Sequence, residues 1–242
     1  MNRRFHVPSL FPGRITLDAA QSRHLRDVLR IQEGDSVSLF DNAGHLARAL
    51  VVRLADLVEM QVAAVADAPK IAAPLTIAAA TPKGARADWM VEKLSELGVA
   101  CLIPLNSART VVHPEAGKLQ RWQRIAAESA KQCKRPAVME ILAPQGLSQI
   151  AADARYARHT RWLLSTTCDS APASAATAAL ADQPILALIG PEGGWTDSEE
   201  SLLRTSGFAP LQLTRTILRI ETAAVVLASL VMVQIAGPVS KE

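Results

Sequence analysis

The sequence predicts an α/β protein in which a small β-barrel precedes a second domain built on a parallel sheet. Alternating apolar and polar residues at 36–40, 46–52 and 58–65 are typical of antiparallel strands. A linker with two prolines follows at 67–74. Beyond it, continuous apolar runs alternate with helical patterns, which indicates an α/β arrangement. We therefore expect one domain over residues 1–69 and another over 75–242.

The predicted barrel begins with short strands at 3–7 and 14–17, joined by a Pro/Gly turn, followed by a helix at 19–30. Helical spacing places Leu25, Val28 and Leu29 toward the core. Phe5 lies among basic residues and could stack on a nucleic-acid base, but we favour an inward position for it.

The second domain has five predicted strands and five predicted helices. The strands lie at 75–80, 99–105, 162–166, 185–189 and 211–213, and the helices at 86–97, 118–134, 171–181, 196–207 and 221–235. A capping box of Thr196 and Glu199 opens the fourth helix, whose apolar face comes from Leu202 and Leu203. The last helix is apolar nearly all round, so we expect it to be deeply buried or packed against a second copy of the chain.

The composition of the chain excludes several classes of protein. Three cysteines, odd in number and without a Cys-x-x-Cys pair, argue against a disulfide framework or zinc site and for a reducing compartment. The longest apolar run, 223–233, is too short to span a bilayer, and the N-terminus lacks the apolar core of a signal peptide. We expect a cytosolic protein with no metal, whose cysteines are inert core thiols.

The strongest functional signal is a glycine-rich loop at 190–194, directly after the apolar strand 185–189. In open α/β sheets ligands bind at the carboxyl ends of strands. Glycine has no side chain, so a ligand can come close to the backbone of this loop. The loop lacks the Gly-Lys-Ser/Thr of a Walker A motif and the spacing of a dinucleotide fingerprint, so phosphate cradling is disfavoured. The alternative is a simple turn of a kind common in α/β proteins.

Two charged residues, Arg219 and Glu221, fall where a loop meets the last helix. Charged groups at such a junction are placed to contact a ligand. The alternative for Glu221 is that it only stabilises the helix start, where a negative charge is favourable.

Basic residues gather in two regions. Six arginines and two histidines fall within the first thirty residues, and six basic residues against one acidic residue fall between 118 and 135. Both regions are candidates for contact with nucleic-acid phosphates. Solvated surface is the alternative in each case.

Several motifs carry a family resemblance. They are Arg4-Phe5-His6, His24-Leu25, Lys83-Gly84, Glu92-Lys93, Pro104-Leu105 with Ser107 and Arg109, Arg121-Trp122, Gly190-Pro191-Glu192-Gly193-Gly194, and Ile217-Leu218-Arg219 with Glu221. In this order, over nearly the whole chain, they resemble the ribosomal RNA small subunit methyltransferase E family, the 16S rRNA uridine N3-methyltransferases. The resemblance implies a PUA-like barrel and a SPOUT methyltransferase domain with a C-terminal trefoil knot. It also implies a homodimer that uses S-adenosylmethionine to methylate 16S rRNA in the small ribosomal subunit.

The resemblance implies which residues hold the cofactor, and together with the two basic regions it gives the candidates for RNA contact. Cofactor-binding candidates are Ser165, Thr166, Ile189, Gly190, Pro191, Gly193, Gly194, Leu213, Thr214, Thr216, Ile217 and Leu218. RNA-binding candidates are Arg3, Arg4, His24, Arg26, Arg30, Lys83, Arg86, Arg109, Arg121, Arg124 and Arg135. For catalysis, our hypothesis is that Arg219 orients the uracil or its phosphate, and that Glu192 or Glu221 is the base or holds Arg219 in place.

The chain departs from the family pattern at Thr214, Thr216, Ile220 and Lys134. A family arginine is replaced at 216, so its role is lost or passes to Arg215, which weakens the substrate assignment more than the cofactor assignment. Two other functions therefore stay open: methylation of a different RNA, and a non-catalytic RNA-binding factor in ribosome assembly.

Overall fold

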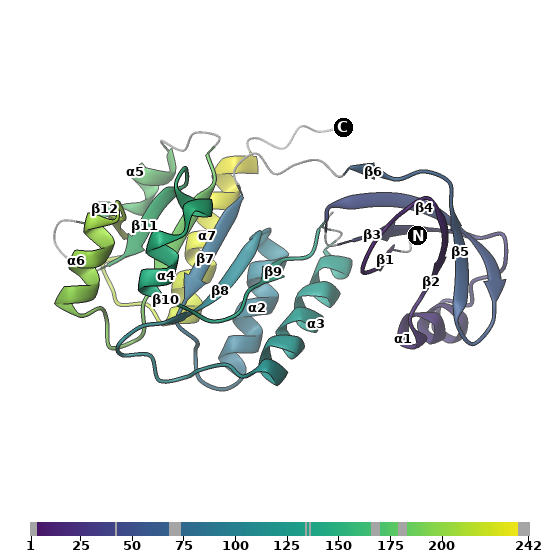
Figure 1. Cartoon of the computed structure of the whole chain (residues 1–242), viewed down its shortest axis with the longest axis horizontal. Helices are drawn as coiled ribbons and strands as arrows, with labels where there is room; N and C mark the ends of the chain where they lie inside the picture. The colour runs from purple at the N-terminus through teal and green to yellow at the C-terminus, as the bar shows by residue number, and fades with distance from the viewer. Residues whose placement is uncertain are drawn as a thin grey trace. The chain divides into compact units, whose positions relative to one another are not determined.

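The computed structural model describes residues 4–41, 43–67, 74–133, 135, 137–165, 170–178 and 183–236 (Figure 1). The chain forms two compact units. One contains residues 1–70 with 127–138, and the other contains 71–126 with 139–242. The end of helix α3 (Ala116–Gln132) therefore groups with the N-terminal unit.

The first unit is a six-stranded sheet in the order β1-β3-β4-β5-β2, with β6 paired to β4. Its strands are β1 (Arg4–His6), β2 (Gly13–Thr16), β3 (Ser36–Phe40), β4 (His45–Leu54), β5 (Val58–Val62) and β6 (Ala66–Asp67). The alternating segments pair antiparallel as predicted. The first strand differs from the prediction, because β1 pairs parallel to β3.

The alternation of β3 explains the core of this unit. Val37 and Leu39 are buried, whereas Ser36 and Ser38 point away from the core. The inward residues pack against Phe5, which is 4% exposed, so its predicted core position is confirmed.

The helical segment of the first unit differs from the predicted single helix. α1 (Ala19–Arg23) is capped by Asp18, which accepts a hydrogen bond from the Gln21 N–H. A π-helical turn follows over His24–Val28, with the Leu29 N–H donating to the His24 carbonyl. This wider turn changes the helical phase, so Leu25 stays buried but Val28 is 66% exposed. The predicted inward position of Val28 is therefore wrong.

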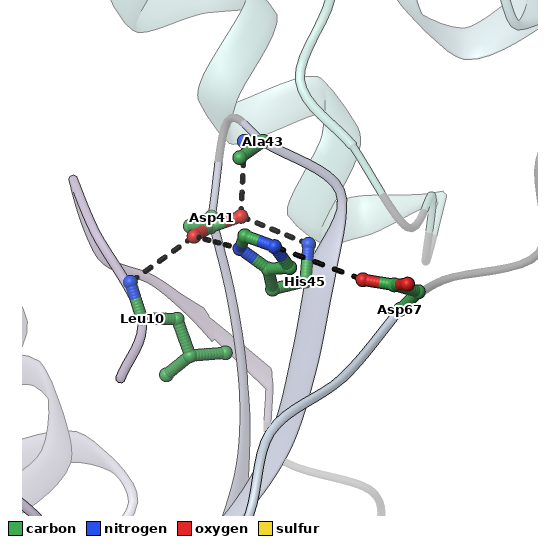
Figure 2. Close-up of polar contacts among 5 residues, drawn as sticks. All are labelled: Leu10, Asp41, Ala43, His45 and Asp67. Carbon is green, nitrogen blue, oxygen red and sulfur yellow. Dashed lines mark hydrogen bonds and ion pairs between the residues drawn. The ribbon is translucent and has the colours of Figure 1, made fainter. Parts of the chain in front are cut away.

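A polar cluster fixes the turn between β3 and β4 (Figure 2). The Asp41 carboxylate, 2% exposed, accepts hydrogen bonds from the backbone N–H groups of Leu10, Ala43 and His45. The His45 ring adds a contact of 2.8 Å from Nδ1 to Asp41, and its Nε2 lies 3.7 Å from Asp67 on β6. Although burial favours the protonated acid, the His45 and Leu10 hydrogen bonds hold the Asp41 pKa below its ordinary value.

The second unit is a parallel sheet in the order β10-β8-β7-β13-β11-β14-β12, with β9 beside β8. Its strands are β7 (Leu75–Ala79), β8 (Cys101–Asn106), β9 (Glu140–Ile141), β10 (Gln145–Gly146), β11 (Thr160–Leu164), β12 (Ala171–Pro172), β13 (Ile185–Ile189) and β14 (Ala209–Gln212). The predicted α/β class is confirmed. The strand order places β14 beyond β11, so the chain leaving β13 crosses back past β11; the trefoil knot itself stays a prediction.

Helices cover both faces of this sheet, which explains why its central strand β13 is apolar throughout. The helices are α2 (Ala85–Leu97), α3 (Ala116–Gln132), α4 (Leu147–Ala152), α5 (Ala173–Ala178), α6 (Asp197–Thr205) and α7 (Ile220–Ala236), with a 3₁₀ turn at Ala154–Tyr156. α2 packs on α7, and α4 packs on α6. Leu186 and Leu188 of β13 join the core that contains Leu203 and Phe208 from the α6 region.

The helix ends follow the sequence signals. Gly98 closes α2 with a left-handed φ of 100°, and the predicted capping box of Thr196 and Glu199 opens α6. Leu202 is 37% exposed, however, so Leu203 supplies the buried side of α6 and the inward prediction for Leu202 is wrong.

The apolar helix α7 is buried on one side only. Ala224, Leu227 and Val231 are inaccessible, whereas Val233 is 75% exposed. Among the described helices, none has the combination of length and apolarity that crossing a membrane requires.

Candidate functional site

A pocket of about 400 Å³ lies at the carboxyl ends of β11, β13 and β14. These strands are neighbours in the sheet, so the loops that follow them meet at one edge. Every cofactor-binding candidate in the described ranges lines this pocket: Ser165, Ile189, Gly190, Pro191, Gly193, Gly194, Leu213, Thr214, Thr216, Ile217 and Leu218. The remaining candidate, Thr166, lies outside the described residues.

Trp195 shapes one wall of the pocket and was not predicted from the sequence. Its indole N–H donates to the Leu164 carbonyl at 3.1 Å, which joins the ends of β13 and β11. A Cβ atom on Gly190 would lie 2.8 Å from Cε2 of this ring. Only glycine therefore fits beneath the indole. The position of Trp195, directly after the glycine loop, was the signal that could have identified it.

The glycine loop is held from the side by Arg109, which the sequence had suggested as an RNA contact. Its Nη1 donates to the carbonyls of Gly193, at 2.5 Å, and Trp195, at 3.2 Å. The preceding residue, Ala108, donates its backbone N–H to Glu199 at 2.7 Å. The loop after β8 is thus tied to the glycine loop, to Trp195 and to the first turn of α6.

Glu199 serves two purposes in this arrangement. Its carboxylate caps α6 through the Thr196 N–H, at 2.9 Å, and accepts the Ala108 N–H. Burial favours its protonated form, but these backbone donors keep the pKa of Glu199 below its ordinary value.

The third loop of the pocket contains two of the departures from the family pattern. The Thr214 hydroxyl donates to the Thr216 carbonyl at 2.7 Å, so these residues stabilise a tight turn. Ile217, which follows the turn, is 84% exposed although it lines the pocket. The aliphatic side chain is therefore available to cover a bound ligand.

The catalytic candidates are arranged differently from our hypothesis. Glu221 and Glu192 both pair with Arg86, at 3.3 and 3.6 Å, and in the described part of the chain neither contacts Arg219. Arg219 is exposed, and its carbonyl accepts the first helical hydrogen bond of α7 from Ala223. The predicted role of the glutamates in holding Arg219 is therefore wrong, because the cation between them comes from α2.

Other basic candidates of the second unit lie on its surface. Lys83 and Arg124 are exposed, and exposed Arg121 forms an ion pair with Asp88 at 2.9 Å.

The basic candidates of the first unit fall into two groups. His24 and Arg30 are exposed, whereas Arg4 stacks over the Phe40 ring at 4.6 Å and Arg26 donates to the Ala55 carbonyl. The prediction for Arg135 is wrong: this residue is only 9% exposed, and burial lowers its pKa. It cannot lie on an exposed phosphate-binding face. Arg3 lies outside the described residues.

The cysteines show no sign of chemistry. Cys101 is buried, which raises its pKa to about 12, and Cys133 is half-buried. Cys168 lies outside the described residues. Within the described ranges, His, Cys, Asp and Glu residues form no group of three or more placed to hold a metal ion.

Two domain families match the chain. The family described as "RNA methyltransferase domain" matches residues 69–232, and the one described as "RNA methyltransferase PUA domain" matches residues 17–56. The first match covers more than half of the chain, and the second falls in the N-terminal sheet.

Relatives over most of the chain carry one name. The ribosomal RNA small subunit methyltransferase E of Synechocystis is 36% identical, over 88% of this chain and 70% of its own. That of Bacillus subtilis is 28% identical, over 86% and 85%. A crystal structure of the Neisseria gonorrhoeae protein, bound to S-adenosyl methionine, is 27% identical, with a TM-score of 0.79 and coverage of 95% and 96%. These matches show that the chain belongs to the ribosomal RNA small subunit methyltransferase E family.

Proposed function

We propose that this protein transfers a methyl group from S-adenosylmethionine to N3 of a uridine in the 16S rRNA of the small ribosomal subunit. The observation that carries the proposal is the pocket at the ends of three adjacent parallel strands, lined by the candidate loops. The cofactor bound to the Neisseria gonorrhoeae relative supports it.

The residues present suit S-adenosylmethionine. The pocket volume of about 400 Å³ lies within the range of roughly 300–1,000 Å³ typical of small-molecule sites. Ile189, Leu213 and Leu218 offer an apolar surface for an adenine ring, while the bare backbone of the glycine loop offers peptide groups for polar contacts. When bound, the cofactor supplies a methyl group on a positively charged sulfur.

Glu192 is the best-placed proton acceptor. It lines the pocket, and its side chain is 54% exposed, so it lies at the mouth where a substrate base would enter. Glu221 is buried and does not line the pocket, and Glu200, which does, pairs with Arg204 at 3.1 Å. In the proposed reaction, Glu192 would accept the uracil N3–H proton, and the lone pair left on N3 would form the bond to the methyl carbon as the carbon–sulfur bond of the cofactor breaks and leaves its electron pair on sulfur.

Arg219 is suited to stabilising the substrate. It is exposed and lies between Leu218 and Ile220, both of which line the pocket. A guanidinium group here would orient the uracil or its phosphate and offset the negative charge that develops as N3 loses its proton.

The roles proposed for the two domains follow from the position of the reacting atom in the substrate. Uracil N3 is on the Watson–Crick edge, so the nucleotide must be unpaired or extruded before it reacts. In the proposed division of labour, the barrel of residues 1–69 and the basic side of α3 hold the RNA, and the domain of residues 75–242 performs the transfer. A homodimer acting in the cytoplasm completes the proposal.

The test is methylation by the purified protein. Labelled S-adenosylmethionine is incubated with small ribosomal subunits from cells that lack this modification, and the digested rRNA is analysed by mass spectrometry. The proposal expects label in 3-methyluridine from 16S rRNA. Label in another nucleoside or another RNA would indicate a different target, and no label despite bound cofactor would refute the proposed reaction with this substrate.

A further inference from the structure

The Arg86 guanidinium group links helix α2 to helix α7 and to the glycine loop, which lines the pocket. Arg86 lies in the first turn of α2, and its Nη1 is 3.3 Å from Glu221 Oε1 on α7 and 3.6 Å from Glu192 Oε1 in the glycine loop. Both carboxylates therefore share one nitrogen atom. Arg86 connects an exposed side chain of the loop to a buried side chain of α7.

Burial decides which of the two carboxylates anchors the arginine. The Glu221 side chain is 8% exposed, and in the described part of the chain its Oε2 is buried with no hydrogen-bond partner. A buried carboxylate without a nearby cation is strongly unfavourable, so the Arg86 pair with Glu221 has to persist. The packing of α2 on α7 holds both residues in place.

Glu192 depends on Arg86 for its position. Two glycines follow it in the chain, and glycine restricts the backbone of this loop less than any other residue type. Within the described ranges, Arg86 is the one charged group that pairs with it. At 54% exposure, Glu192 without this contact would sample many rotamers.

We propose that Arg86 is a positioning residue, which holds the Glu192 carboxylate at the mouth of the pocket while buried Glu221 anchors the arginine. The inference rests on the proposed function and deepens it. It assigns Glu221 an anchoring role instead of a proton-accepting one, and it replaces the RNA contact that the sequence had suggested for Arg86.

The first test needs neither cofactor nor RNA. Arg86→Met removes the charge, and Arg155→Met removes another salt-bridged arginine, paired with Asp153, that does not line the pocket. Amide exchange of Gly194, whose N–H donates to the Pro191 carbonyl at 2.8 Å, reports opening of the loop. We expect exchange to accelerate about tenfold or more in Arg86→Met and to stay unchanged in the control. Equal exchange in both variants would contradict the proposal.

The second test is a double-mutant cycle with Glu192→Gln. If Arg86 acts through Glu192, each single variant lowers kcat on the order of 100-fold, and the double variant is no slower than Glu192→Gln alone. The KM for RNA should stay within about twofold in Arg86→Met, because no phosphate contact is lost. Multiplicative losses in kcat, or a raised KM for RNA with kcat retained, would overturn the assignment.

A conservative variant covers the case in which Arg86→Met does not fold. Because both pairs use one nitrogen, an ammonium group can replace it, so Arg86→Lys should fold and keep kcat within about fivefold. A folded Arg86→Lys as slow as Glu192→Gln would refute the positioning role. Methylation by the wild-type protein is measured in the same experiment. If the wild-type protein does not methylate RNA, that result counts against the proposed function. The amide-exchange experiment would still show whether Arg86 holds the glycine loop through Glu192.

Discussion

At the scale of single residues, the pocket depends on the fit between Gly190 and the Trp195 indole. This fit could not be predicted from the sequence, although the glycines themselves pointed to a close approach. The sequence pattern likewise placed Glu192, Glu221 and Arg219 near the pocket but paired them wrongly. The Arg86 partner lies 135 positions from Glu221, and local patterns hold no information about such a contact.

Gly190→Ala tests the fit directly. The new Cβ would lie 2.8 Å from Trp195, so the ring must move and the pocket wall with it. We expect the affinity for S-adenosylmethionine, measured by calorimetry, to fall at least about tenfold. Gly117→Ala on α3 is the control, because its Cβ would meet nothing within 4 Å. An unchanged affinity in Gly190→Ala would show that the indole does not shape the cofactor site.

Arg219→Ala separates the substrate from the cofactor. Arg219 is exposed beside the pocket but does not line it. If its guanidinium group orients the uracil and offsets the negative charge on the base, its loss should reduce methylation by about 100-fold or more. The Kd for S-adenosylmethionine should stay within about twofold. The methylation rate and the Kd for S-adenosylmethionine are measured on the same preparation of each protein. Arg155→Ala serves as the control variant. Near-normal turnover would exclude the role in orienting uracil.

At the scale of helices and strands, the sequence predicted the segments that have a clear local pattern. It did not predict the features that depend on packing against other parts of the chain. The apolar run of β13 and the capping box of α6 agree with the structure to within a residue or two. The π-helical turn after α1 and the parallel pairing of β1 with β3 depend on tertiary packing. Val28 and Leu202 were misplaced for the same reason, since helical spacing alone does not fix which residue faces the core.

The cluster between β3 and β4 makes the stability of the first unit depend on pH. The hydrogen bond to Asp41, together with the charges of Asp41 and Asp67, raises the pKa of His45 above its ordinary value. A group with a raised folded pKa stabilises the fold fully below its unfolded pKa of about 6.5, and this contribution is lost as the pH rises through the folded pKa.

We therefore expect the midpoint of thermal unfolding to fall as the pH is raised from about 6 to 8. His45→Gln, which cannot take up a proton, should show a smaller fall over this window. Calorimetry or circular dichroism of both proteins in matched buffers measures it. Identical pH dependence in the two proteins would show that protonation of His45 does not contribute to the stability of the fold.

At the scale of the whole molecule, the sequence predicted five of the eight strands of the parallel sheet, but neither the short strands β9, β10 and β12 nor the strand order. Five apolar runs were assigned as strands of one parallel sheet, and the glycine loop was placed at a carboxyl edge. The sequence does not encode in any local pattern that β11 lies between β13 and β14. That order brings the three loops of the pocket together, so the cofactor residues followed from family resemblance, not from periodicity.

RNA binding should depend strongly on salt if the exposed face of α3 contacts phosphates. Arg121→Glu with Arg124→Glu should weaken RNA binding and reduce the slope of log K against log salt by about 1 to 2. Arg155→Glu with Arg158→Glu changes the net charge equally at another exposed site and serves as the control. Filter binding at several salt concentrations gives the slopes. Equal losses in both double variants would assign the effect to net charge.

The most direct test of the account is a crystal structure or calorimetric titration with S-adenosylmethionine. We expect a single site per chain, with the cofactor between the glycine loop and the 213–218 loop, against Trp195 and Leu218. Gly190→Ala should weaken this binding at least about tenfold, and Arg219→Ala should keep the Kd within about twofold. No binding by the wild-type protein, or a cofactor located outside the pocket at the ends of β11, β13 and β14, would contradict the account.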